Sequence, residues 1–132
     1  MRWRSRVSQL STVLTVLLAT AAGHEAEAYV SEGHEYTLKC SNDGYVLRSK
    51  YPVARFIEGG AASRIEKLKH EEIYLGKDCD AYHKIFGGGE WCWANGGFRA
   101  EFPLHEFGFP RQELYCQPPR PYEGNCSCGR TN

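Results

Sequence analysis

Three side chains near the middle of the chain have the chemistry of metal ligands. Asp78, Asp80 and His83 fall within six consecutive residues and offer two carboxylates and an imidazole. On a loop, such a set could bind a divalent cation through two oxygens and one nitrogen. A solvated turn around a disulfide-bonded Cys79 accounts for the same residues. The three are therefore weak metal candidates, and the sequence predicts no cofactor.

Acidic side chains later in the chain could take part in catalysis. Glu101, Glu106 and Glu113 could provide the general acid and base of a glycosidase, although the sequence does not set the distances between them. Residues 70–72, His-Glu-Glu, lack the second histidine of a zinc protease helix. No pattern pairs a nucleophile with a base. The sequence therefore favours a protein that is not an enzyme, and a small secreted hydrolase, with or without a metal, is the alternative.

Aromatic side chains beside glycines are the candidates for binding. Trp91 and Trp93 lie on one face of an expected strand, and that face is either core or a rigid contact surface. The segment 107–109, Phe-Gly-Phe, leaves the same choice open. Polar neighbours could add hydrogen bonds to a protein or a sugar ring. The candidate binding residues are therefore Trp91, Trp93, Asn95, Arg99, Phe107, Phe109 and Arg111.

A β-hairpin must position the tryptophans. Asn95-Gly96 favours a two-residue type I′ turn, because both residues tolerate positive φ. A strand over 90–94 would precede the turn, and a strand with Phe98, Ala100 and Phe102 on its apolar face would follow it.

Alternation with a period of two predicts further strands over 36–40, 45–51 and 73–75. Asn42-Asp43-Gly44 predicts the turn between the first two. Tyr45, Leu47 and Tyr51 would share one face of the second, and Pro52 ends that strand before 53–57 resumes it. In residues 61–72, Ser63 and Glu66 resemble a capping box, which predicts a short helix. A lysine-rich edge strand is the alternative there.

These elements predict a mainly β domain, a small antiparallel sheet or partly closed barrel with at most one short helix. The 132 residues allow one small domain, which we expect over 29–116, followed by a tail rich in proline and cysteine over 117–132. Charged residues at 24% indicate a globular chain, and a formal net charge of zero argues against a nucleic-acid partner.

The first residues have the pattern of an export signal. Arg2, Arg4 and Arg6 precede an apolar run over 10–22, which is shorter than the about 20 residues of a spanning helix. Ala26-Glu27-Ala28 then matches a signal-peptidase site, with an earlier site after 19–21 and an uncleaved anchor as alternatives. We expect a signal peptide over 1–28, no membrane anchor after cleavage, and a secreted or periplasmic protein.

The cysteines follow the signal and agree with export, because six thiols in a small exported chain indicate a disulfide framework. Zinc is the rival, but no Cys-x-x-Cys pair is present. Six cysteines allow 15 pairings, and the sequence alone does not choose among them. A Cys79–Cys92 bond would close a short loop, and a Cys40–Cys116 bond would join the first strand to the end of the core. Cys126 and Cys128 would then bond each other under strain, or pair with the core cysteines in a rearranged scheme. The disulfide residues are Cys40, Cys79, Cys92, Cys116, Cys126 and Cys128.

Residues 93–102, Trp-Ala-Asn-Gly-Gly-Phe-Arg-Ala-Glu-Phe, resemble the end of a small bacterial secreted domain of unknown function. Phe98 stands where that family has a cysteine, so its disulfide pairing does not transfer. A looser resemblance, through residues 36–40 and the glycine-aromatic hairpin, is to the periplasmic lysozyme inhibitors. Their serine-glycine-x-x-tyrosine loop has no match in this chain. The resemblances imply a small antiparallel barrel and no catalytic residue. Together these features predict an exported, inhibitor-like binding domain with a protein or glycan ligand.

Overall fold

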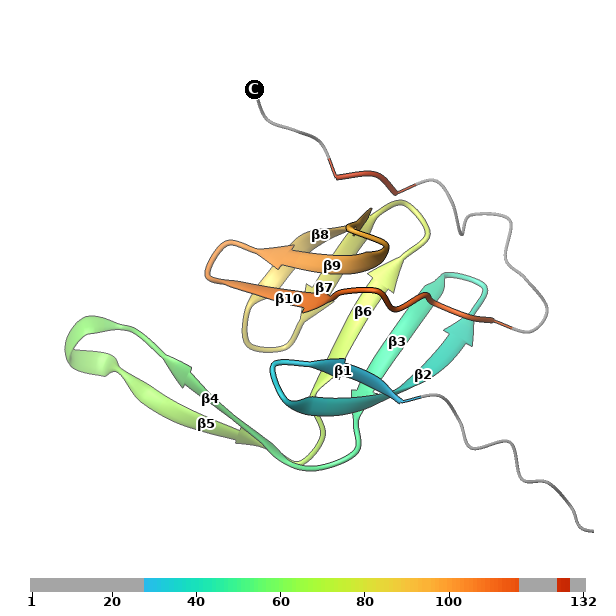
Figure 1. Ribbon diagram of the computed structural model, residues 1–132. Coiled ribbons are helices and arrows are strands. Elements are labelled where there is room, and N and C mark those ends of the chain that lie inside the picture. Colours follow the sequence, from blue (N-terminus) through green and yellow to red (C-terminus); the bar gives the residue numbers. More distant parts are fainter. Residues whose placement is uncertain (1–27, 117–125, 129–132) are drawn as a thin grey trace, which may run out of the picture.

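The computed structural model describes residues 28–116 and 126–128. Eight strands form one antiparallel sheet in the order β1-β2-β3-β6-β7-β8-β9-β10, and β4 pairs with β5 in a separate hairpin, here called the arm, that projects from the sheet (Figure 1). This confirms the predicted fold class. The strands are β1 (Tyr29–Ser31), β2 (His34–Ser41), β3 (Gly44–Ser49), β4 (Val53–Ile57), β5 (Arg64–Leu68), β6 (Glu72–Gly76), β7 (Asp80–His83), β8 (Gly87–Ala94), β9 (Gly97–Phe102) and β10 (His105–Phe109).

The sheet curls until its two edge strands, β1 and β10, come into contact, so it is nearly closed. A side chain bridges the remaining gap. The Gln112 amide accepts a hydrogen bond from the Val30 backbone N–H and donates one to the Val30 carbonyl, both at 2.8 Å. Gln112 thereby gives the edge of β1 the hydrogen bonds that a neighbouring strand would supply.

The interior of the sheet is built from aromatic rings. The predicted strand faces are confirmed for Tyr45 and Leu47, which are buried, whereas Tyr51 is exposed because β3 has already ended at Ser49. Alternation along each strand turns every second side chain inward. The large side chains that are fully buried include Trp91, Tyr36, Tyr45, Phe98, Phe107, Phe109, Leu47, Ile73 and Leu75.

The short helix predicted over 61–72 is wrong. A 3-10 turn at Gly60–Ala62 leads into strand β5. The Ser63 hydroxyl stabilises this turn by accepting a hydrogen bond from the Gly59 N–H at 3.2 Å. Ile65 is exposed and Leu68 is buried, which is the pattern of a strand, since residues three apart lie on opposite faces of a strand. The lysine-rich edge strand was therefore the correct alternative.

The structure confirms the Cys40–Cys116 disulfide and corrects the other pairs. Cys79 bonds Cys126 and Cys92 bonds Cys128, so the predicted Cys79–Cys92 pair is wrong. The reason is that residues 126–128 lie beside β8, where Ser127 forms a parallel bridge with Trp93. Cys126 and Cys128 thus reach separate partners without a strained bond between them. The predicted signal peptide lies almost wholly outside the described residues, as does most of the expected tail.

A buried carboxylate joins the arm to the sheet. Glu71, fully buried just before β6, accepts hydrogen bonds from Arg55 of β4 at 2.6 and 2.7 Å and from the Tyr36 hydroxyl of β2 at 2.5 Å. His83 of β7 lies 3.1 Å from the same carboxylate. The Arg55 guanidinium also stacks 5.0 Å from the centre of the Phe107 ring. Four strands therefore meet at one ion pair.

Hydrogen bonds set the tautomer of His83 and shift the pKa values of Glu71 and Tyr36. The backbone N–H groups of Ile85 and Phe86 donate to His83 Nδ1 at 3.0 and 3.3 Å, so the ring proton lies on Nε2 and points at Glu71. Burial alone would raise the pKa of the Glu71 carboxyl, but hydrogen bonds from Arg55, His83 and Tyr36 outweigh it and lower this pKa to about 2. Burial and the hydrogen bond to Glu71 raise the pKa of the Tyr36 hydroxyl.

We expect Glu71→Gln to destabilise the fold by about 3–5 kcal/mol at neutral pH, because it leaves the buried Arg55 guanidinium with only the solvent-exposed Glu32 carboxylate, 2.9 Å away, as its ionic partner. The variant should also change the response to acid. The pKa of Glu71 falls from an ordinary value of 4.5 to about 2 on folding, so its stabilisation is present above pH 4.5 and is lost as the pH falls toward 2. Urea unfolding at several pH values from neutral to acidic measures both effects.

Glu106→Gln is the control, because Glu106 is exposed on β10. Glu106→Gln should lose stability in acid as wild type does, whereas Glu71→Gln should not show this loss. Equal acid sensitivity of wild type and Glu71→Gln would contradict the assignment of this loss to Glu71.

Candidate functional site

A pocket of about 550 Å³ opens at the turn between β8 and β9. The strand end and turn form one wall, and the segment after β10 forms the other. Two aromatic rings, an amide and a carboxylate line it. The lining residues are Trp93, Ala94, Asn95, Gly96, Gly97, Glu113, Leu114 and Tyr115. Here the structure brings two of the predicted binding residues, Trp93 and Asn95, into one cavity.

The Trp93 ring is half-buried and held on its inner side by other rings. Trp91 and Phe98 contact it edge-on, with ring centres 5.6 and 6.0 Å away. The Trp93 backbone N–H donates to the Cys126 carbonyl at 2.8 Å, which fixes the strand from the outside. Its indole N–H has no hydrogen-bond acceptor among the residues that the structure describes. Trp93 therefore has a fixed position and an aromatic surface that still borders the pocket.

The turn beside Trp93 has the conformation that its sequence predicts. Asn95 and Gly96 both have positive φ, 53° and 70°, as a type I′ turn requires. Gly97 comes next, and a side chain there would collide with the backbone oxygen of Phe109. The turn consequently packs against β10, and the exposed Asn95 borders the pocket.

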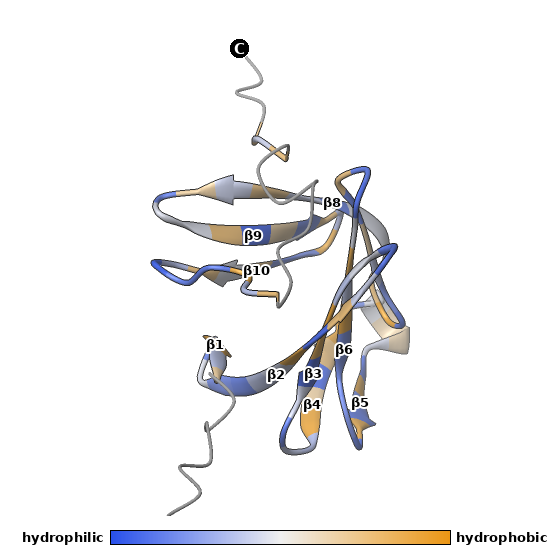
Figure 2. Cartoon of the chain, turned by 90° about the vertical axis from the view of Figure 1, so that its right-hand side faces the viewer, coloured by the Kyte–Doolittle hydropathy of each residue, from blue (hydrophilic) through white to orange (hydrophobic). Residues whose placement is uncertain are grey.

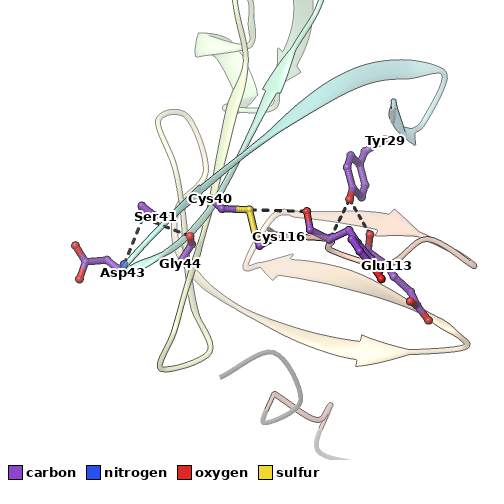
Figure 3. Close-up of a disulfide and its surroundings, with 8 residues drawn as sticks. Tyr29, Cys40, Ser41, Asp43, Gly44, Glu113 and Cys116 are labelled. Atoms are coloured by element: carbon purple, nitrogen blue, oxygen red, sulfur yellow. Dashed lines mark hydrogen bonds between the residues drawn. A yellow bond between two sulfur atoms is a disulfide. The ribbon is translucent and has the colours of Figure 1, made fainter. Parts of the chain in front are cut away.

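The opposite wall is fixed by a disulfide and a tyrosine (Figure 3). Cys116 is bonded to Cys40 of β2, and the Tyr29 hydroxyl donates to the Glu113 carbonyl at 2.7 Å. The same hydroxyl accepts a hydrogen bond from the Tyr115 N–H at 3.1 Å. The Tyr115 side chain is 64% exposed and faces solvent at the pocket rim. Both walls are thus fixed before any ligand arrives.

The remaining predicted binding residues lie elsewhere. Trp91, Phe107 and Phe109 belong to the core, with at most 1% of their surface exposed, so the structure does not bring them to a ligand. Their burial follows from inward alternation on β8 and β10. Arg99 pairs with Glu101 at 2.7 Å on the outer face, and Arg111 is exposed in the turn after β10.

The weak metal candidates do not meet. Asp80 points outward from the start of β7, whereas His83 points into the core at its other end and binds Glu71. Asp78 is exposed in the turn before β7. The structure does gather Cys92, Glu101 and Cys128, but the two sulfurs are joined in a disulfide and offer no thiolate to a metal.

The fold separates one of the glutamates considered for catalysis from the other two. Glu113 belongs to the pocket described above, whereas Glu101 and Glu106 are directly opposite partners on β9 and β10. Glu90 of β8 lies opposite Glu101 on its other side, and Asp80 of β7 lies opposite Glu90. Four carboxylates therefore form a row across four strands, beside a second hollow of about 550 Å³ lined by Asp80, Glu90 and Glu101.

The chain was compared with protein-family models, with curated proteins and with solved structures, and none of the three comparisons finds a match. Of the helical segments in the described part of the chain, none has the length and apolar character needed to cross a membrane.

The sequence analysis did not name Tyr115 among the candidate binding residues. Its position next to Cys116 was the available signal, because a disulfide can hold a neighbouring side chain at the surface.

The acidic row generates a test of its electrostatics. Like charges directly opposite in a sheet repel, so Glu90→Gln should stabilise the protein by a few tenths of a kcal/mol at low salt. High salt should shrink this gain, because it screens the repulsion. Thermal unfolding at two salt concentrations measures the difference in stability.

Glu35→Gln is the control, because Glu35 lies 3.8 Å from Lys50 and removal of its charge should give no gain in stability. Destabilisation by Glu90→Gln at low salt would contradict the repulsion.

Proposed function

We propose that this protein is an exported, non-enzymatic binding domain and that the pocket at Trp93 takes a sugar ring of a glycan. The observation that carries the proposal is the combination of two aromatic side chains, Trp93 and Tyr115, with an amide and a carboxylate in one preformed cavity. Its volume of about 550 Å³ lies within the usual range for small-ligand sites.

Each part of the pocket suits a sugar. An aromatic face stacks on the apolar C–H face of a sugar ring, and the half-buried Trp93 and exposed Tyr115 offer such surfaces. The Asn95 amide both donates and accepts hydrogen bonds, and the Glu113 carboxylate accepts them, which matches the hydroxyl groups of a sugar. Because disulfides and backbone hydrogen bonds hold the walls, binding orders few side chains.

Binding without hydrolysis is supported by the acidic groups at the pocket. Glu113 is the one carboxylate in its described lining, whereas glycoside hydrolysis ordinarily needs a pair. The alternative, a small secreted hydrolase, would have to use the acidic row on the outer face of β7–β10, where no aromatic pair accompanies the carboxylates in the described lining of the hollow.

Action outside the cytoplasm is supported by the covalent framework. All six cysteines are paired, and such disulfides persist in oxidising compartments. The export signal predicted over 1–28 agrees with this compartment. We therefore propose that the protein acts in the cell envelope or outside the cell. Its formal net charge of zero supports a partner other than a nucleic acid.

Titration with a panel of soluble oligosaccharides, followed by tryptophan fluorescence and calorimetry, tests the proposal. Trp93→Ala should weaken binding of the best oligosaccharide by about 10- to 100-fold, because it removes the stacking surface. Tyr51→Ala is the control, since Tyr51 is an exposed aromatic residue that lies outside the pocket, and this variant should bind like wild type.

Two results would count against glycan binding. Failure of every oligosaccharide to bind at millimolar concentration, with the fold intact by circular dichroism, would refute it. Release of shortened sugars from the panel would instead favour the hydrolase, and Glu101→Gln would then show whether the acidic row is responsible.

A further inference from the structure

The arm presents an apolar and basic face that nothing in the described structure covers. Phe56 of β4 lies directly opposite Ile65 of β5, and the two side chains are 62% and 65% exposed. Lys67 lies on the same face opposite Ala54, and the exposed Lys69 follows just beyond the strand. No described residue of β4 or β5 places a carboxylate on this face, since Glu66 alternates to the other side. Figure 2 shows hydrophobic residues along the arm, outside the sheet.

A hollow of about 200 Å³ lies on the outer side of the sheet, between β3, β6 and β7. The partly exposed rings of Tyr74 and Tyr82 line it together with Val46. Asp43 and Asp80 add two carboxylates to the same lining. The hollow is therefore apolar and acidic, whereas the arm is apolar and basic.

The two surfaces lie toward opposite ends of the same strands. The arm leaves from the end of β3 at Ser49 and returns at Glu72 of β6. The hollow extends to the other end of those strands, at Gly44 and Gly76. The arm points away from the sheet, so Phe56 does not reach the hollow of its own chain (Figure 1).

We propose that the arm of one copy of this chain docks into the hollow of a second copy. Phe56 and Ile65 would pack on Tyr74 and Tyr82, while Lys67 and Lys69 would pair with Asp43 and Asp80. Such contacts join different surfaces of the two copies, so they continue head to tail until a ring closes or the chain of copies ends. This inference is independent of glycan binding, because the pocket at Trp93 contributes to neither surface.

Charge complementarity favours a second copy over an anionic bilayer as the occupant. Two lysines and two aspartates match in number, and the chain as a whole has a formal net charge of zero. A bilayer surface rich in anionic lipid would also attract the lysines, but a chain with no net positive charge gains little further attraction to it. The hollow offers the lysines the opposite charge and the phenylalanine an aromatic wall.

Sedimentation velocity of the full disulfide-bonded chain, purified after export, tests the docking. Wild type should associate as its concentration rises toward the millimolar range, and high salt should weaken the association by about 10-fold or more. Phe56→Ser and Asp80→Lys should each abolish it, and both lie at exposed positions, so circular dichroism should show an intact fold. Leu104→Ser is the matched control, because Leu104 is exposed in the turn after β9, outside both surfaces, and this variant should associate like wild type.

Mixing the two variants gives a sharper result. Phe56→Ser keeps an intact hollow and Asp80→Lys keeps an intact arm, so the mixture should form a one-to-one complex and nothing larger. Monomeric wild type at millimolar concentration and low salt overturns the proposal, as does association that survives Phe56→Ser or fails to reappear in the mixture. Flotation of a monomeric wild type with phosphatidylglycerol vesicles, lost in Phe56→Ser, would assign the arm to lipid and overturn it too.

Discussion

The placement of the Glu71 carboxylate constrains more of this structure than any other single group. A fully buried charge is tolerable only when hydrogen bonds and an opposite charge compensate for its lost hydration. Tyr36, Arg55 and His83 supply these from three different strands. All three must therefore reach the same point, which fixes how β2 and β7 approach each other and where the arm begins. The Arg55 guanidinium, packed on Phe107, extends this constraint to β10.

The disulfides act at the other end of the sheet. Cys126 and Cys128 bind the described part of the tail to β8 and to the turn before β7, while Cys116 binds the segment after β10 to β2. Trp93 lies between these connections. The ionic cluster and the covalent framework thus hold different ends, and the pocket at Trp93 belongs to the covalently held end. We expect this end to tolerate changes of the side chains that line the pocket, because its backbone does not depend on them.

How well the sequence predicts this structure depends on how local the responsible interaction is. The hairpin at Asn95-Gly96 is predictable because two neighbouring residues with positive φ determine the turn. The prediction of a helix over 61–72 is wrong, because the strand pairing of Ile65 with Phe56 outweighs a capping pattern of four residues. The pairing of Cys79 with Cys126 and the ionic cluster at Glu71 depend on distances across the sheet, which spacing along the chain does not contain. Trp93 and Asn95, which line the pocket, were among the residues predicted from the sequence, whereas the place of Tyr115 beside them depends on the Cys40–Cys116 disulfide.

The exposure of Phe56 follows from the same carboxylate. Arg55 must face inward to reach Glu71, and because side chains alternate along a strand, Phe56 must face outward. Shifting the register by one residue would bury Phe56 and expose Arg55, leaving the Glu71 charge without its partner. The register therefore determines that the side chain of residue 56 faces outward. It does not determine which amino acid stands there, since serine or threonine would suit a solvent-facing position as well. A phenylalanine opposite an isoleucine on a projecting hairpin is an association hazard unless a surface receives it. The geometry therefore explains why this face is outside, and the docking proposed above accounts for its composition.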